Sequence, residues 1–110
     1  MIDGVVHVNF QMISDFASDK KMKDVWRTVF ALVANIEMHN IVKTSVAEIA
    51  EQLDVKASKV RSHIDALRNA GLLEFDEEGI YLNPHFVWKG SPESHQTSMR
   101  AAVKPTFLTA

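Results

Sequence analysis

Most of the side chains that could do chemistry lie in one short stretch, residues 56–69. This stretch holds four cations, Lys56, Lys59, Arg61 and Arg68, against the single acid Asp65. Residues 74–78, in contrast, contain four acids and no base. The net charge of −2 for the whole chain argues against indiscriminate coating of nucleic acid. Cations gathered at one place instead indicate a local surface for phosphate groups.

A helix over this stretch would have one apolar and one polar face. Val60, Ile64 and Leu67 recur at helical spacing and are expected to point inward. A rotation of about 100° per residue then places a polar face outward, flanked by Lys59 and Arg61. That outward face consists of Ser58, Ser62, Asp65 and Asn69. Its hydroxyl groups could bond to base edges, and its cations could reach guanine or phosphate. A merely solvated helix face is the alternative interpretation.

The candidate DNA-binding residues follow from this geometry. They are Lys56, Ser58, Lys59, Arg61, Ser62, His63 and Arg68. His63 is placed either for a phosphate or for the packing edge of the helix. Asp65 either accepts a hydrogen bond from cytosine or lies beyond the groove.

Few residues have the types and spacing that a metal site or a catalytic site requires. The five histidines have no spacing typical of metal ligands, and the chain has no cysteine. The four glycines form no phosphate-binding loop, and no nucleophile and base follow a known catalytic pattern. The sequence therefore predicts no metal site, no cofactor, no catalytic residues and no enzymatic activity.

Two short helices joined by a tight corner are predicted over residues 44–73. Ser45 and Glu48 form a capping box that starts the first helix at the next position. Asp54 is one of the few residue types that tolerates the left-handed backbone of a sharp corner. The second helix begins just beyond the corner and ends at Gly71. The cationic stretch is thus the second helix of a pair.

After this helix pair, apolar residues recur at every second position, the spacing of a β-strand. Residues 73–75 and 80–82 are joined by an acidic turn that ends in Gly79, which is typical of a β-hairpin. Residues 40–43 form a short extended link that could pair with the hairpin. Residues 83–90, NPHFVWKG, continue as an extended arm, because proline cannot donate to a sheet and disfavours helix before it.

The N-terminal part is expected to supply one strand and two helices. Residues 5–10 are rich in strand-forming types and predict a short strand. Asn9 can cap a turn or two of helix after it. An apolar stripe over residues 22–40 predicts the longest helix, a platform for the helix pair.

The helix pair and the hairpin resemble winged-helix DNA-binding proteins. The resemblance is carried by Ile49-Ala50, Leu53-Asp54-Val55, Val60, Ile64 and residues 67–73. Winged-helix proteins usually have glycine where this chain has Asp54. The segment NPHFVWKG, which begins with Asn-Pro, also resembles the end of the winged-helix domain in plasmid replication proteins of the RepL type. The likeness covers residues 22–90.

This resemblance implies both a fold and a function. The fold would be mainly α (α+β), a winged helix-turn-helix with a short N-terminal strand, three main helices and a C-terminal β-hairpin wing. The function would be sequence-specific binding of double-stranded DNA, in plasmid or phage replication initiation or its transcriptional control. The alternative is a winged-helix module that binds protein through the acidic wing and the arm over residues 84–90. Acids within about 10 Å of phosphates would repel DNA, which favours this alternative.

Length and composition favour a single domain with a partner subunit. At 110 residues and 46% apolar content, we expect a domain over residues 1–90 and a loosely held tail over 91–110. Without cysteine, an export signal or a membrane span, the cytoplasm is the expected location. The chain has more large apolar residues than one small core can cover, so we expect a homodimer anchored by Trp26, Phe86 and Trp88. A replication or regulatory protein is a further candidate partner.

Overall fold

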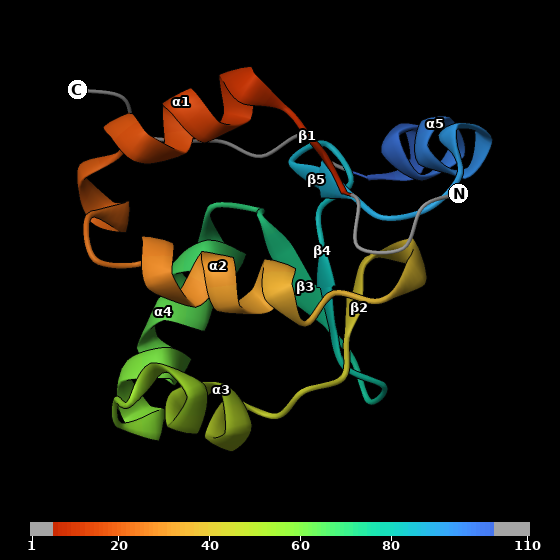
Figure 1. Ribbon diagram of the computed structural model, residues 1–110. Coiled ribbons are helices and arrows are strands. Elements are labelled where there is room, and N and C mark those ends of the chain that lie inside the picture. The colour runs from red at the N-terminus through yellow and green to blue at the C-terminus, as the bar shows by residue number, and fades with distance from the viewer. Residues whose placement is uncertain (1–5, 103–110) are drawn as a thin grey trace.

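Five α-helices and two small antiparallel sheets make up residues 6–102, the part of the chain that the computed structural model describes (Figure 1). The helices are α1 (Phe10–Ser18), α2 (Trp26–Ala34), α3 (Val46–Leu53), α4 (Ala57–Asn69) and α5 (Pro92–Ala101). The strands are β1 (His7–Val8), β2 (Ile41–Val42), β3 (Leu73–Phe75), β4 (Ile80–Leu82) and β5 (Val87–Trp88). Two short 3-10 helices are η1 (Lys20–Met22) and η2 (Met38–Asn40). The fold is therefore α+β with helices dominant.

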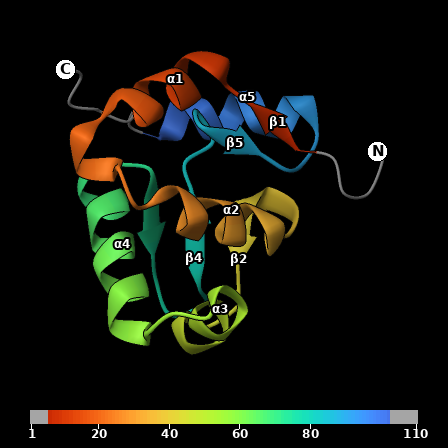
Figure 2. The same ribbon diagram turned by 60° about the vertical axis from the view of Figure 1, so that its left-hand side comes forward.

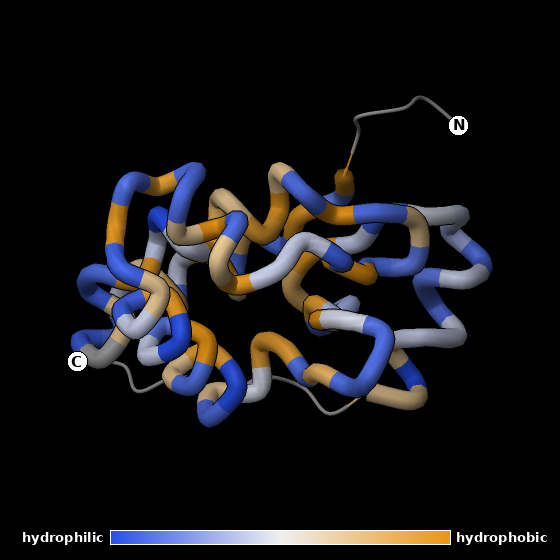
Figure 3. Tube along the Cα trace, turned by 90° about the horizontal axis from the view of Figure 1, so that it is seen from below, coloured by the Kyte–Doolittle hydropathy of each residue, from blue (hydrophilic) through white to orange (hydrophobic). Residues whose placement is uncertain are grey.

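Helices α2, α3 and α4 pack around a shared apolar core (Figure 2). Each contributes one residue without exposed surface, namely Leu32, Ile49 and Val60. Hydrophobic and hydrophilic residues alternate at short intervals along the trace, as amphipathic elements require (Figure 3). Burial of the apolar faces stabilises the arrangement, since it removes them from water. Helix α2 is thus a platform for the predicted helix pair.

The larger sheet has the strand order β2-β4-β3. Strands β3 and β4 form a hairpin, and β2 pairs with the other edge of β4, with Val42 opposite Ile80. At Gly79 a Cβ atom would lie 2.6 Å from the carbonyl oxygen of Val42, so only glycine fits there. The predicted hairpin and its extended partner over residues 40–43 are confirmed.

The smaller sheet joins the N-terminal segment to the arm through β1 and β5. Just after β1, the backbone N–H of Asn9 donates to the carbonyl of Phe86 (3.0 Å). The side chain of Asn9 also caps α1, because its oxygen accepts from the N–H of Met12 at 3.1 Å. The strand and the capped helix are confirmed, although β1 is shorter than predicted and Val5 lies outside the described residues.

A buried asparagine, Asn40, connects the two sheets. Its side-chain amide donates to the carbonyls of Leu82 (2.9 Å) and Val87 (2.7 Å), and its oxygen accepts from the N–H of Lys89 (2.9 Å). The residue is 2% exposed and has a φ of 68°, a left-handed conformation that asparagine tolerates. Three bonds from one side chain therefore hold the ends of β4 and β5 together.

The prediction of one long helix over residues 22–40 is wrong. Helix α2 is only nine residues long and has a 3-10 helix before and after it. Asn35 ends it, since its backbone N–H bonds to the carbonyls of Ala31 and Leu32 and its side-chain amide donates to Ala31 at 2.7 Å. The apolar spacing continues through the 3-10 turns, so periodicity alone does not reveal these breaks.

The prediction of a loose tail is wrong for residues 91–102. Ser91 caps α5, because its hydroxyl oxygen accepts a hydrogen bond from the N–H of Ser94 at 3.2 Å. Pro92 is the first residue of the helix. His95 stacks on Trp88, with 5.3 Å between ring centroids. A ring stack does not appear as an apolar stripe, so periodicity missed this attachment.

Residues 103–110 of the predicted tail lie outside the described part of the chain. Within residues 6–102, no helix is both long and apolar enough to cross a lipid bilayer.

Candidate nucleic-acid interface

The corner between α3 and α4 is built by local hydrogen bonds. Ser45 Oγ accepts from the N–H of Glu48 at 3.1 Å, and the Glu48 carboxylate accepts from the N–H of Ser45 at 3.4 Å. These bonds form the predicted capping box. Asp54 takes the predicted left-handed conformation, with φ 55° and ψ 48°. The next N–H, of Val55, then bonds back to Ala50 at 3.0 Å.

A cation from α2 secures the same corner. Arg27 Nη2 donates to the carbonyl of Leu53 at 3.0 Å, at the C-terminal end of α3. A positive charge is favourable there because helix carbonyls are unpaired at that end. The corner is therefore held by both its own backbone and the platform helix.

Helix α4 presents the predicted polar face to solvent. Its buried residues are Val60, Ile64 and Leu67, as the sequence predicted. Six of the seven candidate DNA-binding residues are exposed: Lys56, Ser58, Lys59, Arg61, Ser62 and Arg68. The structure thus brings small hydroxyl groups and long cations together on one side of one helix.

The seventh candidate, His63, lies at the packing edge of the helix. Its Nδ1 is 2.7 Å from the hydroxyl oxygen of Thr28 on α2, and the ring is half-buried. Burial, and then the positive charge of Lys59, lower the pKa of His63, while Asp24 acts in the opposite direction. Of the two predicted positions for His63, the structure shows packing and not an outward orientation toward phosphate.

Arg68 has a contact that the sequence did not indicate. Its guanidinium carbon lies 4.5 Å from the centre of the Phe75 ring, on β3. This geometry is a cation–π interaction between the end of α4 and the hairpin. Arg68 therefore helps to orient the hairpin while its charge stays at the surface.

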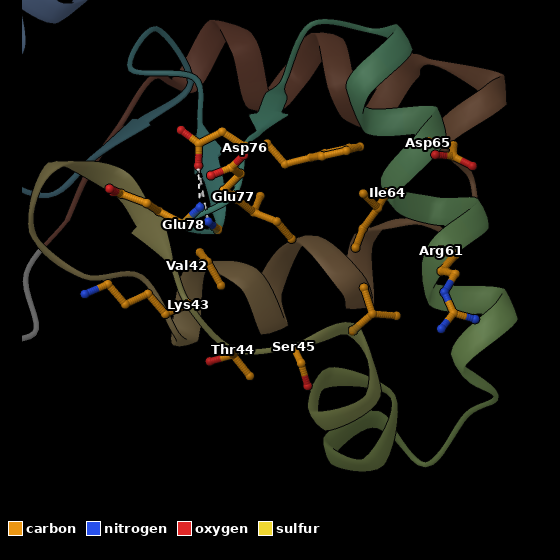
Figure 4. A pocket seen from close by; sticks show the side chains of 14 residues that line it. Val42, Lys43, Thr44, Ser45, Arg61, Ile64, Asp65, Asp76, Glu77 and Glu78 are labelled. Carbon is orange, nitrogen blue, oxygen red and sulfur yellow. Dashed lines mark hydrogen bonds between the residues drawn. The ribbon is translucent and has the colours of Figure 1, made fainter.

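A groove of about 510 Å³ separates α4 from the hairpin (Figure 4). Arg61 and Asp65 lie on the α4 side, and the acidic turn lies opposite. The charged residues that line the groove are Lys43, Arg61, Asp65, Asp76, Glu77 and Glu78. Because acids outnumber bases, the groove itself does not suit phosphate. Arg61 is the cation of α4 that lines this groove, whereas Lys59 and Arg68 do not line it.

Two acids of the hairpin turn also make hydrogen bonds within the hairpin. Asp76 Oδ1 accepts from the N–H groups of Glu78 (2.8 Å) and Gly79 (3.3 Å), which shapes the turn. Glu78 accepts from the hydroxyl of Tyr81 at 3.1 Å. Desolvation, this bond and the neighbouring carboxylates raise the pKa of Tyr81. Asp76 and Glu78 thus stabilise the hairpin in addition to charging its tip.

The three predicted dimer anchors have different environments. Trp26 is 52% exposed, whereas Phe86 and Trp88 are 4% and 2% exposed. The ring of Trp88 stacks on that of His95 and has its centroid 5.8 Å from that of His39. Phe86 and Trp88 are therefore core residues of the protomer, and their prediction as interface anchors is wrong. Trp88 has ring contacts with His39 of η2 and His95 of α5, whereas the ring of Phe86 lies 6.1 Å from that of Phe16 on α1. The sequence predicted none of these contacts.

Sequence reasoning also missed two residues that position α4. Thr28 was not singled out, although a lone hydroxyl inside the apolar stripe of α2 is a signal for a buried hydrogen bond. Arg27 was missed because its bond to α3 spans 26 positions and leaves no local pattern. Both residues act from the platform helix.

Within the described residues, no group of three or more histidine, aspartate or glutamate side chains could hold a metal ion. A family model described as HVO_A0114 matches residues 30–90, more than half of the chain. The matched segment includes α3, α4 and the hairpin. No curated protein and no solved structure matches the chain.

Proposed function

The chain belongs to the HVO_A0114 family, and we propose that it is a winged helix-turn-helix protein that binds double-stranded DNA with sequence specificity. The proposal rests above all on the exposed face of α4, where cations flank small hydroxyl groups. In this role α3 is the first helix of the motif, α4 the reading helix, and the β3–β4 hairpin the wing.

Five exposed residues on α4 and at its N-cap have roles in this proposal. Ser58 and Ser62 face the base edges, where a hydroxyl can donate or accept. Lys56 and Lys59 neutralise phosphates near the start of the helix, where the helix dipole adds positive potential. Arg61 reaches either guanine or phosphate. Specificity therefore comes from the middle of the face and affinity from its edges.

The Asn-Pro run supports the structural part of the resemblance to replication proteins of the RepL type. The Asn83 amide donates to the carbonyl of Gly71 at 2.9 Å, and its oxygen accepts from the N–H of His85 at 2.8 Å. Asn83 thus connects the end of α4 with the end of the hairpin. We extend the proposal to plasmid or phage replication initiation, or its transcriptional control, in the cytoplasm and without a cofactor.

The acidic hairpin favours one rival, a module that binds protein. The arm over residues 84–90 contributes little to such a surface, because Phe86 and Trp88 are buried. The acidic tip, Asp76–Glu78, is exposed and would suit a basic partner. A stable hetero-complex that is insensitive to DNA would support this rival.

Selection of bound sites from random duplex DNA, followed by titration at two salt concentrations, tests the proposal. A preferred site should emerge, and binding should weaken steeply with salt. Failure to bind any duplex at low salt would reject DNA binding.

Substitutions on α4 then test the reading helix. If Arg61 reads a base, Arg61→Ala should cost about 1–3 kcal/mol and relax the site at one position. If Arg61 meets phosphate, the loss should be uniform and the salt slope should fall by about one. Lys59→Ala should also weaken binding, and Arg100→Ala, which removes an exposed cation from α5, is the matched control. Unchanged affinity in both α4 variants would mean that α4 is not the reader.

A further inference from the structure

An apolar hollow of about 110 Å³ lies where β1, α1 and α2 meet, on a surface that DNA binding does not use. Its walls are the side chains of Val8, Ile13, Phe16, Trp26, Val29, Phe30, Val33, Phe86 and Val87. None of the exposed residues of α4 lines it. An occupant of the hollow would therefore leave α4 free.

Four of the side chains that line this hollow are exposed, and Phe10, a fifth exposed side chain, lies one turn from one of them. Phe30 is 65% exposed and Trp26 is 52% exposed, and the two rings meet edge to face at 5.9 Å. Val8 and Ile13 are 38% and 40% exposed, and Phe10, one turn before Ile13 on α1, is 85% exposed. We call these five side chains the apolar face.

We propose that the apolar face is the contact between two copies of this chain, related by a twofold axis. The face carries both halves of a self-complementary contact, protruding rings and an apolar hollow beside them. In a twofold interface the same patch serves both partners, so a ring of each copy can enter the hollow of the other.

The area of the face suits such a dimer. Three aromatic and two aliphatic side chains at these exposures present roughly 600 Å² of apolar surface. This value is at the upper limit for the largest patch of a monomer, about 300–600 Å². A stable interface buries about 800 Å² per partner, so the face with a polar rim is large enough.

Charge also favours a second copy over a partner of another kind. Helix α1 carries one acid, Asp15, and α2 carries one base, Arg27. Both are engaged within the chain, Asp15 with Gln11 at 2.9 Å and Arg27 with the carbonyl of Leu53 at 3.0 Å. Because the one acid and the one base balance, the two helices together favour neither a basic nor an acidic partner and do not repel an identical one.

Sedimentation of the full chain from about one to one hundred micromolar tests the contact. The unaltered chain should be a dimer, and Phe30→Glu should raise its dissociation constant at least about a hundredfold, since it buries a carboxylate twice. Phe10→Glu should act in the same direction. Circular dichroism would check folding, and Phe10→Glu decides the matter if Phe30→Glu misfolds, because Phe10 is the more exposed.

Met38→Glu is the matched control, since Met38 is 41% exposed but lies on η2, outside the apolar face. It should dimerise as the parent does. A monomeric parent over the whole range would mean that something else, or nothing, covers the face, and would overturn the inference. An equal rise of the dissociation constant in Met38→Glu would overturn the inference as well. So would a dimer that neither Phe30→Glu nor Phe10→Glu weakens. DNA is absent from these measurements, so their result is independent of the proposed function.

Discussion

The hydroxyl oxygen of Thr28 lies 2.7 Å from Nδ1 of His63, a contact that joins α2 to α4 across 35 positions of sequence. Thr28 is 1% exposed and sits among apolar side chains. A neutral imidazole with its proton on Nε2 accepts the hydroxyl proton at Nδ1. A buried polar bond of this kind costs more to break than its net stabilisation suggests, because it leaves an unpaired hydroxyl. The proposed reading helix is thus oriented by a specific bond as well as by packing.

The first prediction concerns pH. The folded chain lowers the pKa of His63 below its usual 6.5, so the folded state favours the neutral ring. Well above pH 6.5 the ring is neutral in both states and its contribution is complete. As pH falls below that value, the unfolded chain takes up the proton first and the free energy of unfolding decreases until the folded pKa is reached.

Denaturant titrations of the parent and of His63→Gln, between about pH 7 and about pH 5, measure this effect. The variant should lose less stability over the interval. Comparison with the parent cancels the contributions of the other four histidines. Parallel pH profiles would show that His63 does not contribute.

The second prediction concerns Asn40. Asn40→Gly keeps the positive φ but leaves two carbonyls and one N–H without their partner. We expect a loss of about 2–4 kcal/mol and a melting temperature lower by at least about 10 °C. Asn40→Ala should cost about 1 kcal/mol more, because alanine resists a φ of 68°. Thermal melts with Asn69→Ala, an exposed control, check this, and a near-neutral Asn40→Gly would contradict it.

The third prediction tests how α5 is attached. His95 stacks on Trp88 and places Nε2 2.7 Å from the carbonyl oxygen of Pro84. Loss of both contacts in His95→Ala should raise local opening about ten- to seventyfold, since together they contribute roughly 1.5–2.5 kcal/mol. Trypsin cleavage at Arg100 should accelerate accordingly.

Fluorescence gives a second readout for the same variant. In a Trp26→Phe background the emission of Trp88 should shift to the red as α5 detaches, because Trp88 becomes solvated. Gln96→Ala, an exposed substitution on α5, is the control. An unchanged cleavage rate and emission would mean that other contacts hold the helix.

The fourth prediction concerns the acidic tip, which we expect to disfavour non-specific DNA. Negative charge near phosphate lowers the general attraction that supplies non-specific affinity. Glu77→Lys is the sharpest change, since Asp76 and Glu78 make the hydrogen bonds that shape the hairpin. It should tighten binding to random duplex more than to the preferred site and steepen the salt slope by about one.

Titration of both duplexes at two salt concentrations measures this effect. Glu93→Lys, the same charge change on α5, is the matched control. Equal tightening by Glu93→Lys would reduce the effect to net charge. Identical affinities for Glu77→Lys and the parent would place the tip away from DNA.

Local signals predicted the helix pair and the hairpin well. The Ser45–Glu48 box, the left-handed Asp54 and the glycine at position 71 each depend on neighbours within a few residues. Their hydrogen bonds form largely without the rest of the fold, so residue type and spacing suffice to recognise them. The exposed face of α4 followed from the same rule, since a helix's apolar face defines its polar one.

Contacts between distant segments could not be predicted in this way. The sequence marked Trp26, Phe86 and Trp88 as large apolar residues, but only the fold buried two of them and exposed the third. The same holds for His63. Its spacing in the sequence put it at the boundary between the buried and the exposed face of α4, and only its contact with the Thr28 hydroxyl shows that it packs against α2.

The sequence by itself therefore determined the local elements, the cationic helix and the acidic turn, because short-range geometry governs them. Only the tertiary structure decided which aromatic residues are available to a partner, where α2 ends and how α5 is held. Packing decides these features, since Trp88 contacts rings from both η2 and α5 and Asn40 bonds to residues more than 40 positions away. No local pattern encodes such pairs, because the free energy that selects them arises only when the segments meet.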